Sequence, residues 1–130
     1  DTLIDLLKET TLKVVFVLHV NHPNELSNDV EKAIRKLKKA SITLLNQTVL
    51  LKGVNDNPRT LTDLSYRLFD NDIQPYYLHL LDKVAGAIHF DIAQEDVLTI
   101  YKKVQKKLPG YLVPKLVSEF QGEANKTLII

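Results

Sequence analysis

The chain has 130 residues, of which 45% are hydrophobic and 25% are charged, so it is long enough for one compact domain with a buried core. Its 17 basic and 16 acidic residues leave a net charge of +1, which argues against nucleic acid or an anionic membrane surface as the main partner. The absence of cysteine excludes disulfides, thiolate nucleophiles and iron–sulfur ligation by this chain.

The sequence contains neither a membrane-spanning run nor, at its start, a secretory signal. No apolar run approaches the roughly 20 residues that span a bilayer, and the start lacks the basic flank and cleavage site of a signal peptide. We therefore expect a cytoplasmic protein without a membrane partner. Because the sequence opens without methionine, inside a predicted helix over Thr2–Glu9, we also expect it to be a piece of a longer protein.

Two apolar stretches in the first half of the chain predict buried parallel strands. Residues 12–20 and 42–51 are mostly apolar and rich in β-branched residues, as strands covered on both faces by helices are. Between them, Ser27 can cap a helix, and apolar residues at helical spacing follow it. The inner stripe of this helix consists of Val30, Ala33, Ile34 and Leu37.

The second half of the chain repeats the alternation of helix and strand. We expect a helix that begins at Thr60, a strand over residues 74–81 and a helix from about Ala93 to Lys107. Residues 111–120 supply a fourth extended segment, in which Pro114 removes one ladder donor and predicts an edge or irregular strand. The order βαβαβαβ predicts an α/β domain with a parallel sheet, either open or part of a barrel.

Polar residues that packing does not require follow each predicted strand. They are His19 after the first strand, Asn55 and Asp56 after the second, Asp82 after the third, and Glu119 with Lys126 after the fourth. In open sheets and in barrels alike, ligands bind where the carboxyl ends of parallel strands meet. The sequence therefore predicts a functional site at this rim.

Four blocks of the sequence also carry a family resemblance. The blocks His19–Glu25, Leu44–Asp56, Pro75–Phe90 and Gly110–Pro114 resemble, in order and spacing, successive blocks of the lysine 2,3-aminomutase family of radical S-adenosylmethionine enzymes. The match covers essentially the whole chain. Two stretches, Tyr76–Lys83 and Gly110–Lys115, are most similar to the branch that isomerises a lysine for attachment to elongation factor P.

The resemblance implies that residues 1–130 are the carboxyl-terminal half of a partial TIM-type barrel, with the pyridoxal phosphate lysine in segment 111–130. The parent enzyme would move the α-amino group of L-lysine to the β-carbon with three cofactors: pyridoxal phosphate, S-adenosylmethionine and a [4Fe-4S] cluster. The cluster cysteines would lie upstream of residue 1, so we expect the isolated chain to be inactive. The implied partners are lysine, the missing amino-terminal half, the elongation factor P pathway and, for the isolated half, a second copy in a homo-oligomer.

The resemblance also implies a role for individual residues. By the match, Lys126 holds pyridoxal phosphate covalently, Asp82 and Glu119 bind the ammonium end of the substrate, His19 and Gln47 contact S-adenosylmethionine, and His79 contacts a cofactor. Three positions depart from the fermentative lysine aminomutases. Those enzymes carry a glycine-rich run where this chain has Gln121–Asn125 with a single glycine, aspartate in place of Glu119, and tyrosine in place of His79.

Each of these residues also has a simpler interpretation. Lys126 can be a solvated surface lysine, Asp82 the cap of the following loop, and His19 a core histidine on an apolar strand. Tyr76 and Tyr77 should alternate between faces, so that one fills the core while the other turns toward the site. The second functional hypothesis is a non-catalytic α/β module that self-associates, or binds pyridoxal phosphate or a partner without turnover.

Overall fold

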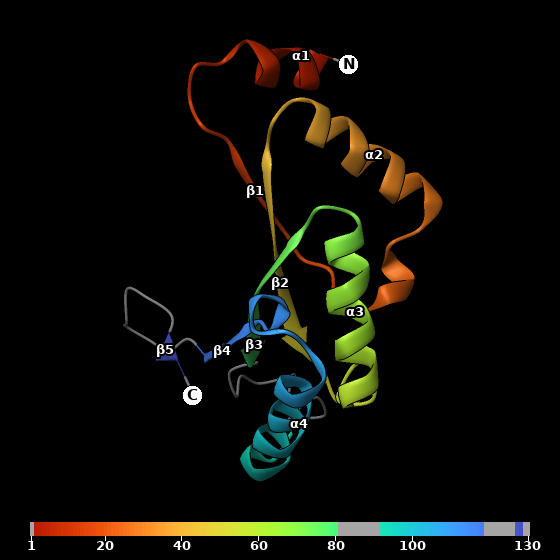
Figure 1. Cartoon of the computed structure of the whole chain (residues 1–130), viewed down its shortest axis with the longest axis vertical. Coiled ribbons are helices and arrows are strands. Elements are labelled where there is room, and N and C mark those ends of the chain that lie inside the picture. The colour runs from red at the N-terminus through yellow and green to blue at the C-terminus, as the bar shows by residue number, and fades with distance from the viewer. Residues whose placement is uncertain (1, 81–91, 119–126, 129–130) are drawn as a thin grey trace, which may run out of the picture.

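The computed structural model describes residues 2–80, 92–118 and 127–128. Within these ranges the chain forms a five-stranded sheet in the order β1-β2-β3-β4-β5 (Figure 1). The strands are β1 (Val15–Leu18), β2 (Thr43–Leu50), β3 (Gln74–Leu80), β4 (Lys115–Ser118) and β5 (Thr127–Leu128). The helices are α1 (Thr2–Glu9), α2 (Asn28–Lys39), α3 (Pro58–Asp70) and α4 (Gln94–Lys107), with the short 3-10 helices η1 (Pro23–Glu25) and η3 (Gly110–Leu112).

Strands β1 to β4 are parallel, and their order in the sheet follows their order in the sequence. A doubly wound sheet reverses its winding at one point, whereas this sheet is wound in a single direction, as a barrel segment is. Because parallel crossovers are right-handed, α2, α3 and α4 fall on the same face. The predicted α/β fold is confirmed, and β5 adds an antiparallel strand that the sequence pattern did not indicate.

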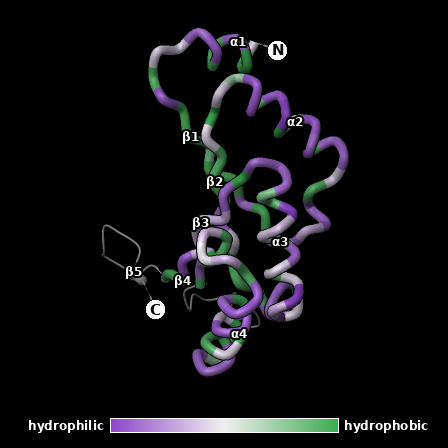
Figure 2. Tube along the Cα trace, viewed as in Figure 1, coloured by the Kyte–Doolittle hydropathy of each residue, from purple (hydrophilic) through white to green (hydrophobic). Residues whose placement is uncertain are grey.

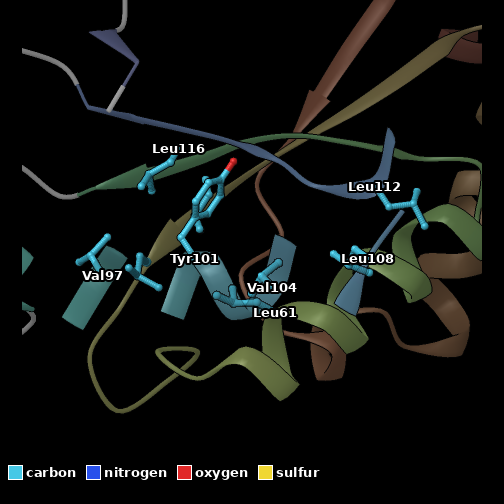
Figure 3. Close-up of a cluster of buried hydrophobic side chains, with 9 residues drawn as sticks. Leu61, Val97, Tyr101, Val104, Leu108, Leu112 and Leu116 are labelled. Atoms are coloured by element: carbon cyan, nitrogen blue, oxygen red, sulfur yellow. The ribbon is translucent and has the colours of Figure 1, made fainter. Parts of the chain in front are cut away.

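Side chains on the helix-covered face form two apolar clusters. The first joins α2, α3 and β2 and includes Ile34, Leu44 and Leu68. The second joins α3 and α4 to β3 and β4 and surrounds Tyr101 and Val104 (Figure 3). On α2 the predicted stripe is narrower than expected: Ile34 is its buried residue, while Val30 at one end stays exposed.

The fourth predicted strand, over residues 111–120, is shorter than expected. Its first residues form η3, and β4 begins only at Lys115, while residues 119–120 lie outside the described ranges. The Tyr101 hydroxyl donates a hydrogen bond of 2.7 Å to the Pro114 carbonyl and thereby ties α4 to the start of β4. Since β4 lies between β3 and β5, the edge-strand alternative of the prediction is wrong, whereas its other alternative, an irregular segment, agrees with η3; Pro114 precedes the strand, where no ladder donor is needed.

Two further boundaries differ from the prediction because side chains replace backbone contacts. The strand predicted over residues 12–20 reaches only Leu18, since the backbone of Val20 bonds to side chains of β2. Helix α3 begins at Pro58 rather than at Thr60, because Asn57 is its N-cap and accepts the Thr60 N–H at 2.8 Å.

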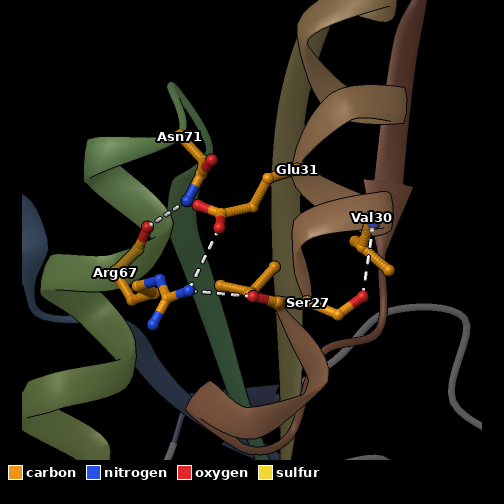
Figure 4. Close-up of polar contacts among 6 residues, drawn as sticks. Ser27, Val30, Glu31, Arg67 and Asn71 are labelled. Carbon is orange, nitrogen blue, oxygen red and sulfur yellow. Dashed lines mark hydrogen bonds and ion pairs between the residues drawn. The ribbon is translucent and has the colours of Figure 1, made fainter.

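Helices α2 and α3 are joined through Arg67 (Figure 4). Its Nη2 donates to the Leu26 carbonyl at 2.9 Å and pairs with Glu31 Oε1 at 3.1 Å. The Asn71 amide, which also bonds to the Arg67 carbonyl, holds the pKa of the Glu31 carboxyl below its ordinary value, and the Arg67 guanidinium adds to this effect. At the start of α2, Ser27 is the N-cap as predicted and accepts the Val30 N–H at 3.4 Å.

The opposite face of the sheet carries no helix among the described residues, and we call it the open face. Along β2 the side chains alternate between buried positions under the helices and half-exposed positions on this face. On β1, Val15 and Val17 are 51% and 42% exposed although both are apolar. Figure 2 shows this hydrophobic composition along β1 and β2. No helix in the described part is both long and apolar enough to cross a membrane.

Candidate functional site

The register of the sheet brings predicted site residues together on the open face. Gln47 of β2 is the partner of Tyr77 on β3, and Tyr77 is the partner of Lys115 on β4. His19 comes directly after Leu18, whose partner is Asn46, so strand alternation places His19 on the face of Val17 and beside Gln47. Neighbouring strands lie about 4.8 Å apart, and these side chains therefore form one row across the sheet.

His79 lies one step further toward the carboxyl ends of the strands. Its partners are Val49 on β2 and Val117 on β4, which places it on the same face as Gln47 and Tyr77. His79 and Gln47 are both half-buried, and His19 is exposed. The interpretation of His19 as a core histidine is therefore wrong, because His19 is exposed and belongs to neither apolar cluster.

A bulge changes the expected alternation of Tyr76 and Tyr77. Asn46 pairs with Pro75 and Gln47 with Tyr77, so Tyr76 is the extra residue on β3. The two rings consequently lie against each other, with centroids 4.2 Å apart, rather than on opposite faces as predicted. A hydrogen bond between the two hydroxyls, and then partial burial, raise the pKa of Tyr77.

Lys115 adds a positive charge to this aromatic pair. Its Nζ lies 5.2 Å from the centroid of the Tyr76 ring, within the range of a cation–π contact. Sequence reasoning missed the grouping of Lys115 with Tyr76 and Tyr77. It depends on the bulge in β3 and on the β3–β4 register, neither of which has a signal in the sequence.

Asn55 and Asp56, predicted at the rim, have structural roles. Asn55 is fully buried, its Nδ2 donates to the carbonyls of Asn21 and Val49 at 2.8 and 2.9 Å, and its Oδ1 accepts the Leu51 N–H at 2.8 Å. Both of its donors are therefore engaged. Asp56 accepts the N–H of Gly53, whose positive φ of 78° explains the glycine in this turn.

Lys126, Asp82 and Glu119 lie outside the described residues, and their assigned roles stay predictions. The structure describes the residues adjacent to two of them in the sequence. Ser118, which precedes Glu119, pairs in β4 with Thr127 of β5, which follows Lys126.

The described residues can be tested against the implied cofactors. No cysteine exists in the sequence, and the described part contains no group of three or more potential metal-binding side chains, so the residues do not fit a [4Fe-4S] cluster. On the open face, the His19 imidazole and the Gln47 amide offer hydrogen bonds beside apolar Val17 and Val49, which is the kind of lining that S-adenosylmethionine requires.

The fold matches part of a radical S-adenosylmethionine enzyme barrel. A radical S-adenosylmethionine methyltransferase from Sphaerobacter thermophilus superposes on 90% of this chain with a TM-score of 0.60, and the match covers 37% of that protein. At 15% sequence identity this likeness shows the fold alone. No protein-family model matches the chain.

Sequence comparison identifies the family more narrowly. The chain is 54% identical over 128 residues to L-lysine 2,3-aminomutase of Haemophilus influenzae and 45% identical over 127 residues to that of Escherichia coli. The Clostridium subterminale enzyme of the same name is 33% identical over 112 residues. The chain belongs to the lysine 2,3-aminomutase family, as its resemblance indicated, and it spans 38% of the Haemophilus influenzae relative and 37% of the Escherichia coli one.

Proposed function

We propose that this chain is the carboxyl-terminal part of an L-lysine 2,3-aminomutase, an isomerase that moves the α-amino group of lysine to the β-carbon. The observation that carries the proposal is the 54% identity to a relative of that name over 98% of this chain. Since the chain spans 38% of that relative, the activity belongs to the full protein. The iron–sulfur cluster would be bound by the remaining part, because this chain has no cysteine.

The proposal gives each site residue one task. His19 and Gln47 bind S-adenosylmethionine on the open face, His79 contacts the pyridoxal phosphate, and Lys126 holds that cofactor covalently. Asp82 and Glu119 pair with the ammonium end of lysine, since two carboxylates suit one –NH₃⁺ in a site poor in water. With one electron from the iron–sulfur cluster of the remaining part, S-adenosylmethionine would supply a 5′-deoxyadenosyl radical and release methionine, and pyridoxal phosphate would hold the migrating amine.

Two features of the described residues support this arrangement. The row from His19 to Lys115 places hydrogen-bonding groups on a face that is otherwise apolar, and such faces bind ligands once the rest of a barrel covers them. The pairing of Ser118 with Thr127 ties together the segments that lead to Glu119 and to Lys126.

Covalent labelling tests the assignment of Lys126. The full protein is incubated with pyridoxal phosphate, reduced with borohydride and mapped by mass spectrometry, and we expect the adduct on Lys126. The variant Lys126→Arg should lose the label, whereas Lys115→Arg, which removes the described lysine on the open face, should keep it. A label distributed over other lysines and missing from Lys126 would disprove the assignment.

Calorimetric titration tests the residues proposed for S-adenosylmethionine. We expect His19→Ala and Gln47→Ala to weaken binding about 5- to 10-fold each, the equivalent of one hydrogen bond of roughly 1 kcal/mol. Lys52→Ala removes an exposed charge after β2 and is the control. Equal affinity in all variants would remove His19 and Gln47 from the site.

We further propose that the parent protein acts in the elongation factor P pathway, in the cytoplasm. The blocks Tyr76–Lys83 and Gly110–Lys115 carry this resemblance, and identity is higher to the Haemophilus influenzae and Escherichia coli relatives than to the Clostridium subterminale one. The full protein should convert L-lysine to β-lysine, and deleting its gene should remove the modified lysine from elongation factor P. An unchanged elongation factor would refute the pathway assignment.

A non-catalytic, self-associating module is the second candidate for the chain in isolation. The specific observation is the exposure of Val15 and Val17 on β1, which is an edge strand within the described sheet. An uncovered apolar face next to a free edge favours association of two copies as a homo-oligomer. Analytical ultracentrifugation should detect a dimer of the isolated chain, and a monomer at high concentration would contradict this hypothesis.

A further inference from the structure

Two polar side chains of β2 are buried on the helix-covered face. Asn46 is 1% exposed and Thr48 is 5% exposed, although their neighbours on this face, Leu44 and Leu50, are apolar. Burying an amide and a hydroxyl destabilises a fold unless both are hydrogen-bonded. Apolar residues would fill these two positions without that requirement, so their polar groups call for an explanation.

Three of the four side-chain hydrogen bonds of this pair go to Val20, and the fourth joins Asn46 to Thr48. The Val20 N–H donates to Asn46 Oδ1 at 2.9 Å, and Asn46 Nδ2 donates to the Val20 carbonyl at 3.0 Å. Thr48 Oγ1 donates to the same carbonyl and accepts from Asn46 Nδ2, both at 3.0 Å. The two side chains thus satisfy each other and hold both backbone groups of Val20.

A second set of hydrogen bonds fixes the next residue. The ladder between β1 and β2 ends at the pair Leu18 and Asn46. Beyond it, the Val49 N–H donates to Asn21 Oδ1 at 2.9 Å, and the Asn21 carbonyl accepts from Asn55 at 2.8 Å. Side-chain amides therefore replace the backbone ladder just past the end of β1.

His19 lies between the last residue of the ladder and the first residue held by this network. Its backbone is fixed on one side through Leu18 and on the other through Val20, so the imidazole can vary in little besides its own rotamer. A ligand contact made by His19 would thus depend on side chains that never touch the ligand.

We propose that Asn46 and Thr48 are positioning residues that set the orientation of His19 on the open face. This inference rests on the proposed function where it concerns S-adenosylmethionine. It extends that function by two residues on the opposite face of the sheet, which act through Val20. The expected consequence is a coupling between a buried hydroxyl under the helices and binding on the open face.

A set of matched substitutions in the full protein tests the proposal. Thr48→Val keeps the shape and removes the hydroxyl, and we expect it to weaken S-adenosylmethionine binding about 5-fold, no more than His19→Ala does, because Thr48 acts through His19. Thr48→Ser keeps the hydroxyl and should restore the affinity. Thr62→Val on α3 is the matched control, because the Thr62 hydroxyl is buried and has no hydrogen-bond partner among the described residues.

A double-mutant cycle separates positioning from general destabilisation. If Thr48 acts through His19, Thr48→Val should have little further effect on the affinity in a His19→Ala background. Histidine-selective ¹⁵N labelling gives a second measurement, and the His19 ring signals should shift in Thr48→Val but not in Thr62→Val. Thr48→Ala, which removes the same hydroxyl, takes the place of Thr48→Val if that variant fails to fold.

The outcomes distinguish this inference from the proposed function. If His19→Ala leaves S-adenosylmethionine binding unchanged, the proposed role of His19 fails, while the ring signals still report on its positioning. If His19→Ala weakens binding but Thr48→Val changes neither the affinity nor the ring signals, the positioning inference is overturned. Full additivity of the two substitutions would also overturn it.

Discussion

Replacement of Asn55 by alanine should destabilise the fold more than any other single asparagine substitution at the rim. Asn55 is fully buried in the turn after β2, and its side chain makes three hydrogen bonds of 2.8 to 2.9 Å. Alanine would leave the Leu51 N–H and the carbonyls of Asn21 and Val49 without these partners. None of the three groups belongs to an exposed residue, so water cannot freely take the place of the Asn55 amide.

The magnitude follows from the three hydrogen bonds that alanine cannot make. Each buried group left without a partner costs about 1 kcal/mol at the lower end of the measured range, so Asn55→Ala should cost about 3 kcal/mol. Asn57→Ala is the graded control, because Asn57 is exposed and makes a single N-cap bond, worth about 1 kcal/mol. Native domains are stable by only about 5 to 15 kcal/mol, so the first change removes a large share and the second a small one.

Urea denaturation followed by circular dichroism measures both free energies of unfolding. The two variants should share one slope and differ in midpoint, with Asn55→Ala at the lower urea concentration. If Asn55→Ala loses no more stability than Asn57→Ala, the three hydrogen bonds of Asn55 do not stabilise the turn after β2, and the predicted cost is wrong.

Three further predictions concern single side chains. Tyr101→Phe should lower the free energy of unfolding by about 1 to 2 kcal/mol, because the Pro114 carbonyl loses its hydrogen-bond donor. Burial raises the pKa of Tyr101, so the stability that its neutral phenol contributes is complete below pH 10 and is lost as the pH rises through the raised pKa. Alkaline unfolding of wild type and variant measures this loss. Glu31→Gln should lower the melting temperature at neutral pH but not in acid. The pKa of Glu31 is lowered in the folded protein, so the stability that its carboxylate contributes is complete above pH 4.5 and is lost as the pH falls through the lowered pKa. A difference in melting temperature that persists in acid would contradict this. Val17→Asp should change the stability of the isolated chain by less than about 0.5 kcal/mol but destabilise the full protein by more, and equal effects in both would show that the open face stays uncovered.

Most of the fold was predictable because its signals are local. The cap at Ser27 and the apolar spacing that follows it predict α2 and its start, and the continuous apolar run of β2 has the composition of a buried parallel strand. Two boundary predictions failed because a side chain took over a backbone hydrogen bond. Val20 bonds to β2 side chains and so ends β1 early, and Asn57 starts α3 before Thr60.

The sequence predicted which residues form the candidate site but not how they are arranged. His19, Gln47 and His79 stand out from the sequence through the family resemblance, and the strand register then brings all three onto the open face. Sequence reasoning did not find Lys115 or the Asn46–Thr48 pair. The one available signal was the polar character of residues 46 and 48 inside an otherwise apolar strand.

The sequence by itself determined the kind of elements, their order and the family, because hydrophobic periodicity, caps and motif blocks are written in residues close to one another along the chain. Only the tertiary structure decided which residues share a face, since a single bulge at Tyr76 shifts the register and changes the partner of every later residue on β3. The same holds for the buried amide that ends β1: Asn46 and Val20 are 26 residues apart in sequence, and folding alone brings them within 2.9 Å.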